Sequence, residues 1–218
     1  MPDQRAAVVV GAGPGMGAAI ARRFRQEGYA VGLVARHPDR LRALAAGIAP
    51  DGVAVAAADV GDEGGLRAAL GDLAAALGDP AVLVFNPSLH VPGPPTDTAY
   101  GDYVGAFRVG TAGLLVCAQA VAPAMRAARR GTILATGSTV ARYPSAEFGT
   151  LSMEKAALRV LTLSLADELE PDGVHVAMVT INGTVGRPGF EPDRIAARYW
   201  ALHEQDRDRW DREVVHDG

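Results

Sequence analysis

Short β-branched apolar runs alternate with longer helical stretches along all 218 residues of the chain. A strand that is apolar at nearly every residue, such as Val8-Val9-Val10, needs helices on both faces of its sheet. The alternation therefore predicts an α/β fold, a three-layer doubly wound parallel sheet (Rossmann fold) formed by a single domain over residues 1–218. The expected strands are 6–10, 30–34, 53–57, 81–85, 132–136, 174–181 and 213–216. The expected helices are 16–27, 39–46, 63–76, 99–129, 151–168 and 192–204.

Composition narrows the possible partners. Acidic residues outnumber basic ones by 25 to 21, and no long basic run supplies the charge that nucleic-acid binding needs. No apolar stretch of about 18 residues is free of charge, Gly or Pro, and the start at Met1 shows no signal-peptide pattern. We therefore expect a small-molecule substrate, no nucleic acid and no membrane.

The numbers and positions of cysteine and histidine bear on the compartment and on metal binding. Cys117 is the single cysteine and cannot form an internal disulfide, so we expect a cytoplasmic protein. The five histidines are scattered, and none pairs with an acid at ligand spacing, so we predict no metal site. Of the 21 basic residues only Lys155 is a lysine, which suggests that this amine is kept for its chemistry.

A glycine-rich loop joins the first expected strand to the first expected helix: Gly11, Ala12, Gly13, Pro14, Gly15, Met16 and Gly17. Glycine permits a tight turn, close approach of backbone to a pyrophosphate, and close packing of helix on strand. The start of the following helix presents free N–H groups and a positive dipole to phosphates. The loop, in this place, predicts dinucleotide binding; the alternative is an ordinary tight turn between strand and helix.

The residue that ends the second strand bears on the choice of dinucleotide. NAD sites usually place an acid there to bind the ribose 2′-hydroxyl, whereas arginine meets the 2′-phosphate of NADP. This chain has Arg36, and the nearest acid, Asp39, is better explained as the N-cap of the next helix. We therefore predict NADP rather than NAD, with a solvated surface charge as the alternative for Arg36.

These residues resemble the short-chain dehydrogenase/reductase family over nearly the whole chain. The glycine loop has the family spacing G-x-x-x-G-x-G. The resemblance implies that Asp59 and Val60 contact the adenine, and that Asn86 and Gly183 belong to the cofactor site. It further implies that Ser138 polarises a substrate carbonyl and that Lys155 holds the nicotinamide ribose.

The family's catalytic tyrosine is absent, however. Its position in the Tyr-x-x-x-Lys motif is Leu151, which cannot move a proton, and the wider Tyr-x6-Lys spacing of enoyl reductases falls on Phe148. The helix asparagine that holds a water in the family falls at Gly110. A missing general acid slows a reaction by about 10²- to 10⁴-fold without forbidding it.

Other side chains could supply the proton. Tyr143, in the loop between Ser138 and the helix of Lys155, ranks first; the alternative is a half-buried loop aromatic. His90 ranks second because it follows the fourth strand at the edge where ligands bind, although a surface role explains it as well. Glu147 is third, and the helix dipole alone would explain an acid there. Arg187 could meet an acidic substrate or a phosphate, or be solvated.

The expected activity is NADP-dependent hydride transfer to or from a carbonyl, alcohol, imine or conjugated double bond. Two alternatives stay open: an inactive NADP-binding sensor or subunit, and a lyase or isomerase on the same fold. Helices 99–129 and 151–168 carry apolar residues on more than one face, and the family commonly pairs through them. We therefore expect a homodimer or homotetramer.

Overall fold

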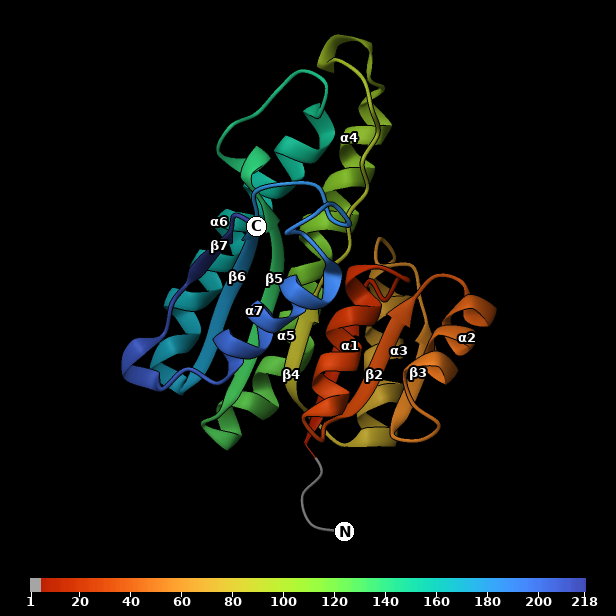
Figure 1. Cartoon of the computed structure of the whole chain (residues 1–218), viewed down its shortest axis with the longest axis vertical. Helices are drawn as coiled ribbons and strands as arrows, with labels where there is room; N and C mark the ends of the chain where they lie inside the picture. Colours follow the sequence, from red (N-terminus) through yellow and green to blue (C-terminus); the bar gives the residue numbers. More distant parts are fainter. Residues whose placement is uncertain (1–4) are drawn as a thin grey trace.

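The centre of the molecule is one parallel sheet of seven strands in the order β3-β2-β1-β4-β5-β6-β7. The computed structural model describes residues 5–218, so the expectation about Met1 lies outside the described residues. Strand order reverses between β1 and β4, which lie side by side in the middle of the sheet (Figure 1). In folds of this kind ligands bind at the carboxyl ends of the two strands where the order reverses. The strands are β1 Ala6–Val10, β2 Ala30–Ala35, β3 Val53–Ala57, β4 Pro80–Phe85, β5 Gly131–Ser138, β6 Val174–Ile181 and β7 Glu213–His216.

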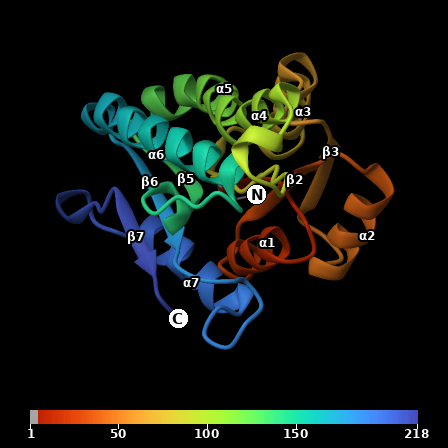
Figure 2. The ribbon, with the colours of Figure 1, turned by 90° about the horizontal axis from the view of Figure 1, so that it is seen from above.

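Helices cover both faces of this sheet (Figure 2). One layer contains α1 (Met16–Gln26), α2 (Pro38–Ile48) and α7 (Pro192–His203). The other layer contains α3 (Glu63–Leu77), α4 (Tyr100–Phe107), α5 (Gly113–Ala128) and α6 (Gly149–Leu169). Each helix layer packs its apolar side chains on the central strands, which are buried along nearly their whole length, and this gives two separate cores. The predicted doubly wound α/β fold is confirmed.

Most predicted elements agree with the structure, and two details are wrong. The predicted helix 99–129 is not one regular helix, because a π-helical turn, Arg108–Ala112, separates α4 from α5. Asp39 is not an N-cap: His37 occupies that position, Pro38 takes the first helical position, and Asp39 pairs with Arg42 at 2.6 Å.

The helical run 100–128 is long and apolar enough to cross a membrane by length and composition alone. In its most apolar window, however, 44% of the residues are buried inside the protein. Its buried residues, among them Leu114, Cys117 and Val121, pack with those of β4, β5, α3 and α6 in one core. This packing shows that part of the run belongs to the core of the domain.

Candidate functional site

A large cavity lies at the carboxyl edge of the sheet, where β1, β2, β3 and β4 end. Its volume is about 970 Å³, which suits a ligand of dinucleotide size. Six of the residues predicted to bind a cofactor line it: Gly11, Gly13, Arg36, Asp59, Val60 and Asn86. The other predicted cofactor residues, Gly15, Met16, Gly17, Lys155 and Gly183, are not part of its wall.

The glycine loop is pressed between β4 and α1. Gly11 has φ +84°, and a Cβ there would lie 2.7 Å from the Pro87 backbone nitrogen. A Cβ on Gly17 would lie 2.7 Å from the carbonyl oxygen of Gly11. Around Gly13, in contrast, a Cβ would meet no atom within 4 Å. Two glycines are thus needed for packing, while Gly13 leaves open space beside the cavity.

Asn86 holds this loop rather than offering a free amide to a ligand. Its Nδ2 donates to the Gly11 carbonyl oxygen at 3.0 Å. Its Oδ1 accepts from the Thr136 hydroxyl at 2.8 Å, and that hydroxyl also lies 2.7 Å from the Tyr199 hydroxyl. The side chain predicted to bind cofactor therefore fixes the glycine loop to β5.

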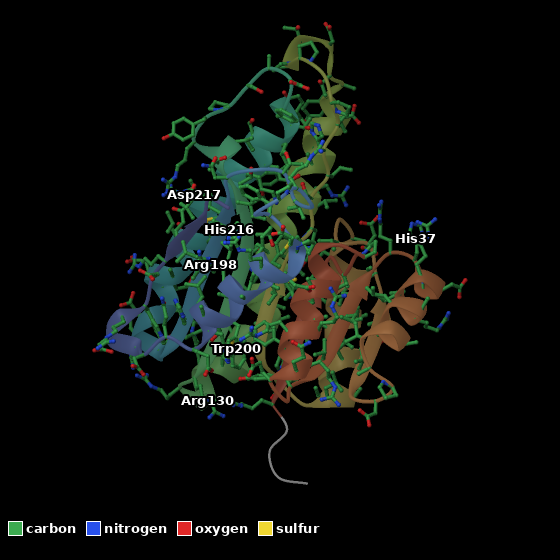
Figure 3. The ribbon with its side chains drawn as sticks, viewed as in Figure 1. His37, Arg130, Arg198, Trp200, His216 and Asp217 are labelled. Carbon is green, nitrogen blue, oxygen red and sulfur yellow. The ribbon has the colours of Figure 1, made fainter. Side chains whose placement is uncertain are left out.

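One end of the cavity is positively charged. Arg36, His37 and Arg40 all line it, and Figure 3 labels His37 at the carboxyl edge. Within residues 5–218 neither of the two arginines has a hydrogen bond or ion pair to its guanidinium, and both are exposed. The one carboxylate in the wall is Asp59, whose Oδ1 accepts from the Gly61 amide at 2.8 Å. This end can bind an anion with two guanidinium groups.

Lys155 is enclosed at the ends of β4 and β5, with only 4% of its surface exposed. Its Nζ donates to the Thr136 carbonyl oxygen at 3.0 Å and to the Pro87 carbonyl oxygen at 3.3 Å. Glu154 Oε1 lies 3.2 Å from the same Nζ. Burial lowers the pKa of the Lys155 ammonium below its ordinary value, and the neighbouring Glu154 carboxylate opposes that effect.

Sequence reasoning missed Glu154, which is fully buried. An acid next to a lysine, as in LSMEKAAL, is typical of the solvent-exposed face of a helix. The structure puts it at Gly110, on a helix far away in the chain, where a Cβ would lie 1.9 Å from the carboxyl carbon of Glu154. A helical periodicity that placed Glu154 on the inward face of α6 was the one signal available.

The remaining predicted catalytic residues, Ser138, Tyr143 and His90, are not part of the cavity wall. Ser138 is half-buried, and its Oγ accepts from the Val140 amide at 3.4 Å, so it caps a short 3₁₀ turn. Tyr143 is 76% exposed and does not line this cavity, so the structure does not bring it to the site. His90 is exposed and packs on Phe148 with ring centroids 5.4 Å apart.

Four residues named in the sequence analysis remain: Arg187 and Gly183 follow β6, and Glu147 and Leu151 lie near the start of α6. Glu147 is exposed, and so is Arg187. Gly183 lies directly against the ring of Phe190. Leu151 is half-buried on α6, one turn before Lys155. Of the predicted set, the structure therefore brings Gly11, Gly13, Arg36, Asp59, Val60 and Asn86 together around one cavity. Lys155 donates to the carbonyl oxygen of Pro87, which lines the same cavity.

Comparison with known proteins decides the family. The model for "short chain dehydrogenase" matches residues 5–187, which include every strand of the cavity wall. The chain belongs to the short-chain dehydrogenase family. The resemblance inferred from the glycine loop is thereby confirmed.

Relatives of this short-chain dehydrogenase include an uncharacterized oxidoreductase of Staphylococcus aureus strain N315. It is 28% identical over 194 residues, covering 88% of this chain and 80% of the relative. A very-long-chain 3-oxoacyl-CoA reductase of Coccidioides immitis is 30% identical over 182 residues, covering 79% of this chain and 51% of the relative.

Solved structures agree over almost the full length. A metagenomic short-chain oxidoreductase in complex with NADP is 31% identical, with a TM-score of 0.90, covering 98% of this chain and 96% of that one. Serine dehydrogenase from Escherichia coli is 25% identical, with a TM-score of 0.86 and 96% coverage of both chains.

Proposed function

We propose that this short-chain dehydrogenase is an NADP-dependent oxidoreductase acting on a carbonyl, alcohol, imine or conjugated double bond. The observation that carries the proposal is the pair of guanidinium groups, Arg36 and Arg40, at one end of a cavity whose floor is the glycine loop. A similar structure contains NADP, which supports the same cofactor here.

The residues of the cavity fit such a cofactor. Arg36 and Arg40 would hold the 2′-phosphate, because both guanidinium groups lack partners within the described chain and no carboxylate ends β2. Asp59 and Val60 would border the adenine, and the open side of Gly13 would admit the pyrophosphate next to the start of α1. When bound, the dinucleotide supplies or accepts a hydride at its nicotinamide ring.

Residues of the chain would orient the substrate and the nicotinamide end of the cofactor. Ser138 would orient the substrate oxygen by donating its hydroxyl proton, which stays free because Oγ only accepts from the Val140 amide. Lys155 would place a positive charge below the nicotinamide ribose. Leu151 offers no proton and Tyr143 is 76% exposed, so we assign the proton to water or to the substrate itself.

Fluorescence titration with NADPH and NADH tests the cofactor. Arg36→Ala and Arg40→Ala should each weaken NADPH binding by about tenfold, with NADH binding unchanged, because each loses a charged contact to phosphate. Arg42→Ala is the matched control, since Arg42 pairs with Asp39 and does not line the cavity. A preference of wild type for NADH of about tenfold or more would refute the assignment of NADP.

A second candidate, an NADP-binding sensor or subunit without turnover, is favoured by Leu151 and by the enclosure of Lys155. NADPH oxidation measured against a panel of ketones, imines and enones separates the two. Turnover that Lys155→Ala abolishes supports the enzyme, and tight NADPH binding without turnover on any member supports the sensor.

We also propose a homodimer or homotetramer in the cytoplasm. Exposed apolar side chains follow one another at helical spacing on α4 and α5, namely Tyr100, Val104, Phe107 and Leu115. Val160, 64% exposed, adds to them from α6. Burying this surface against a second copy would remove it from water. Sedimentation equilibrium tests the assembly.

A further inference from the structure

Glu154 occupies a space that glycine alone can leave open. It lies on α6, and its carboxyl group projects to the π turn Arg108–Ala112, where Gly110 has no side chain. A Cβ at Gly110 would lie 1.9 Å from Glu154 Cδ and 2.3 Å from Oε1, which no real contact allows. The Thr111 hydroxyl, next in the turn, donates to the Glu154 carbonyl oxygen at 3.1 Å. The π turn and Glu154 therefore form one packed unit.

The carboxyl group has a specific set of neighbours. Oε2 accepts from the Leu89 amide at 3.0 Å, and Oε1 lies 3.2 Å from Lys155 Nζ. Within the described residues Oε1 has no hydrogen bond that would replace this ion pair. A fully buried carboxylate with one backbone donor needs a positive charge beside it, since burial of a lone charge is very costly.

The side chains of Glu154 and Lys155 also contact the wall of the large cavity. Lys155 Nζ donates to the Pro87 carbonyl oxygen, and Glu154 accepts from the Leu89 amide. Pro87 and Leu89 both line the large cavity. Each charge of the pair is therefore attached to the segment 87–89 that forms one wall of the proposed NADP site.

Other charged groups near this pair have partners of their own. Arg108, in the π turn, donates to the Gly61 carbonyl oxygen. Arg142 and Arg159, which flank Lys155 in sequence, both pair with Glu213. His90, beyond the wall segment, packs on Phe148. Within residues 5–218, Glu154 is thus the one charged group that contacts Lys155.

We propose that Glu154 is a positioning residue: it is the buried counterion that keeps Lys155 charged and, with it, fixes the wall 87–89 of the cavity. Gly110 is the residue that makes room for it. The inference deepens the proposed function by adding a residue to the same site. Its test uses neither cofactor nor substrate, so failure of the inference and failure of the proposed function are distinguishable.

Because Lys155 is the only lysine, protein grown with lysine labelled with ¹³C at Cε gives one lysine signal that reports its charge by NMR. The Lys155 signal is followed against pH in wild type and in Glu154→Gln. The substitution replaces a charged neighbour of Lys155 by a neutral one of nearly equal volume. We expect the midpoint for Lys155 to fall by about one pH unit or more in the variant. Asp72→Asn is the matched control, because Asp72 is exposed on α3, and it should leave the midpoint unchanged.

An equal midpoint in wild type and Glu154→Gln would overturn the proposal. If Glu154→Gln does not fold, Glu154→Asp keeps the charge on a shorter side chain, and its midpoint should fall by less than one unit. A midpoint below that range in Glu154→Asp would count against charge as the cause.

Thermal unfolding tests the packing of Gly110 independently. Gly110→Ala should lower the melting temperature by about 5 °C or more, because its Cβ meets the carboxyl group. In a Glu154→Ala background the same substitution should have almost no effect. Additive losses in the double variant would show that Gly110 does not serve Glu154.

Discussion

The two edges of the sheet place their polar side chains in opposite ways. At the amino edge, both ring nitrogens of His203 are used: Nε2 lies 2.6 Å from the Tyr29 hydroxyl and Nδ1 lies 2.8 Å from the Thr132 hydroxyl. Phe24 and Trp200 surround them, and Figure 3 shows Trp200 toward this edge. At the carboxyl edge, Arg36 and Arg40 face the cavity with no partner among residues 5–218.

This difference separates stability from binding. Groups that satisfy one another contribute to the free energy of unfolding, whereas unsatisfied charges at an open cavity are available to a ligand. We therefore expect substitutions at the amino edge to change stability alone and substitutions at the charged end of the cavity to change binding alone. The predictions below test that separation.

The largest effect is expected from Phe24→Ala. Phe24 is fully buried and packs edge-on against both Tyr29 and Trp200, with centroids 5.6 Å away in each case. Its loss should reduce the free energy of unfolding in urea by about 3–5 kcal/mol. NADPH affinity of the folded protein should not change. Val185→Ala, at an exposed residue after β6, should cost less than about 0.5 kcal/mol.

A pH effect at the same edge comes next. Burial lowers the pKa of His203 from 6.5 to about 4. Between these values the unfolded chain binds a proton that the folded protein does not, so stability should fall as the pH drops from 6.5 toward 4. The loss should reach at most about 3 kcal/mol in urea unfolding. His203→Gln should reduce this slope, whereas His37→Gln, at an exposed residue, should not.

Gly11→Ala should change both stability and binding, because Gly11 packs against the residues that follow β4 and also lines the cavity. Its φ of +84° and the 2.7 Å approach to the Pro87 nitrogen predict a loss of about 2 kcal/mol in stability together with weaker NADPH binding. Gly13→Ala, with open space around it, should keep its stability within about 0.5 kcal/mol. Equal losses in the two variants would contradict the packing argument.

The smallest free-energy change is expected from Arg36→Asp, which should weaken NADPH binding by about 1–2 kcal/mol and strengthen NADH binding. The melting temperature should stay the same, because Arg36 is exposed and has no partner among residues 5–218. A fall in melting temperature without a change in NADPH affinity would show that Arg36 is structural.

Local patterns were enough to predict the strands, because the central ones combine β-branched residues with burial on both faces. The strands 6–10, 53–57, 174–181 and 213–216 were predicted with the bounds that the structure has. The π turn within 99–129 was not predicted, and the side chain packed against it comes from another helix: the Glu154 carboxyl group fills the space at Gly110. No local pattern reports such a contact.

The site was predictable in part for the same reason. The glycine loop and Arg36 are adjacent in sequence to strand ends, so topology alone places them at one cavity. The use of Asn86 to hold Gly11, and the enclosure of Lys155, depend on neighbours more than 15 residues away in the chain. Tyr143 was ranked first as a proton donor from its loop position, which does not determine its 76% exposure.

The burial of Lys155 has a practical consequence for anyone who handles this protein. With its one lysine 4% exposed, the folded chain presents no accessible side-chain amine to acylating dyes, aldehyde fixatives or succinimidyl cross-linkers. Such reagents should therefore leave the lysine of the folded protein unmodified. Dye attached to Lys155 on warming would then report transient opening of the interior.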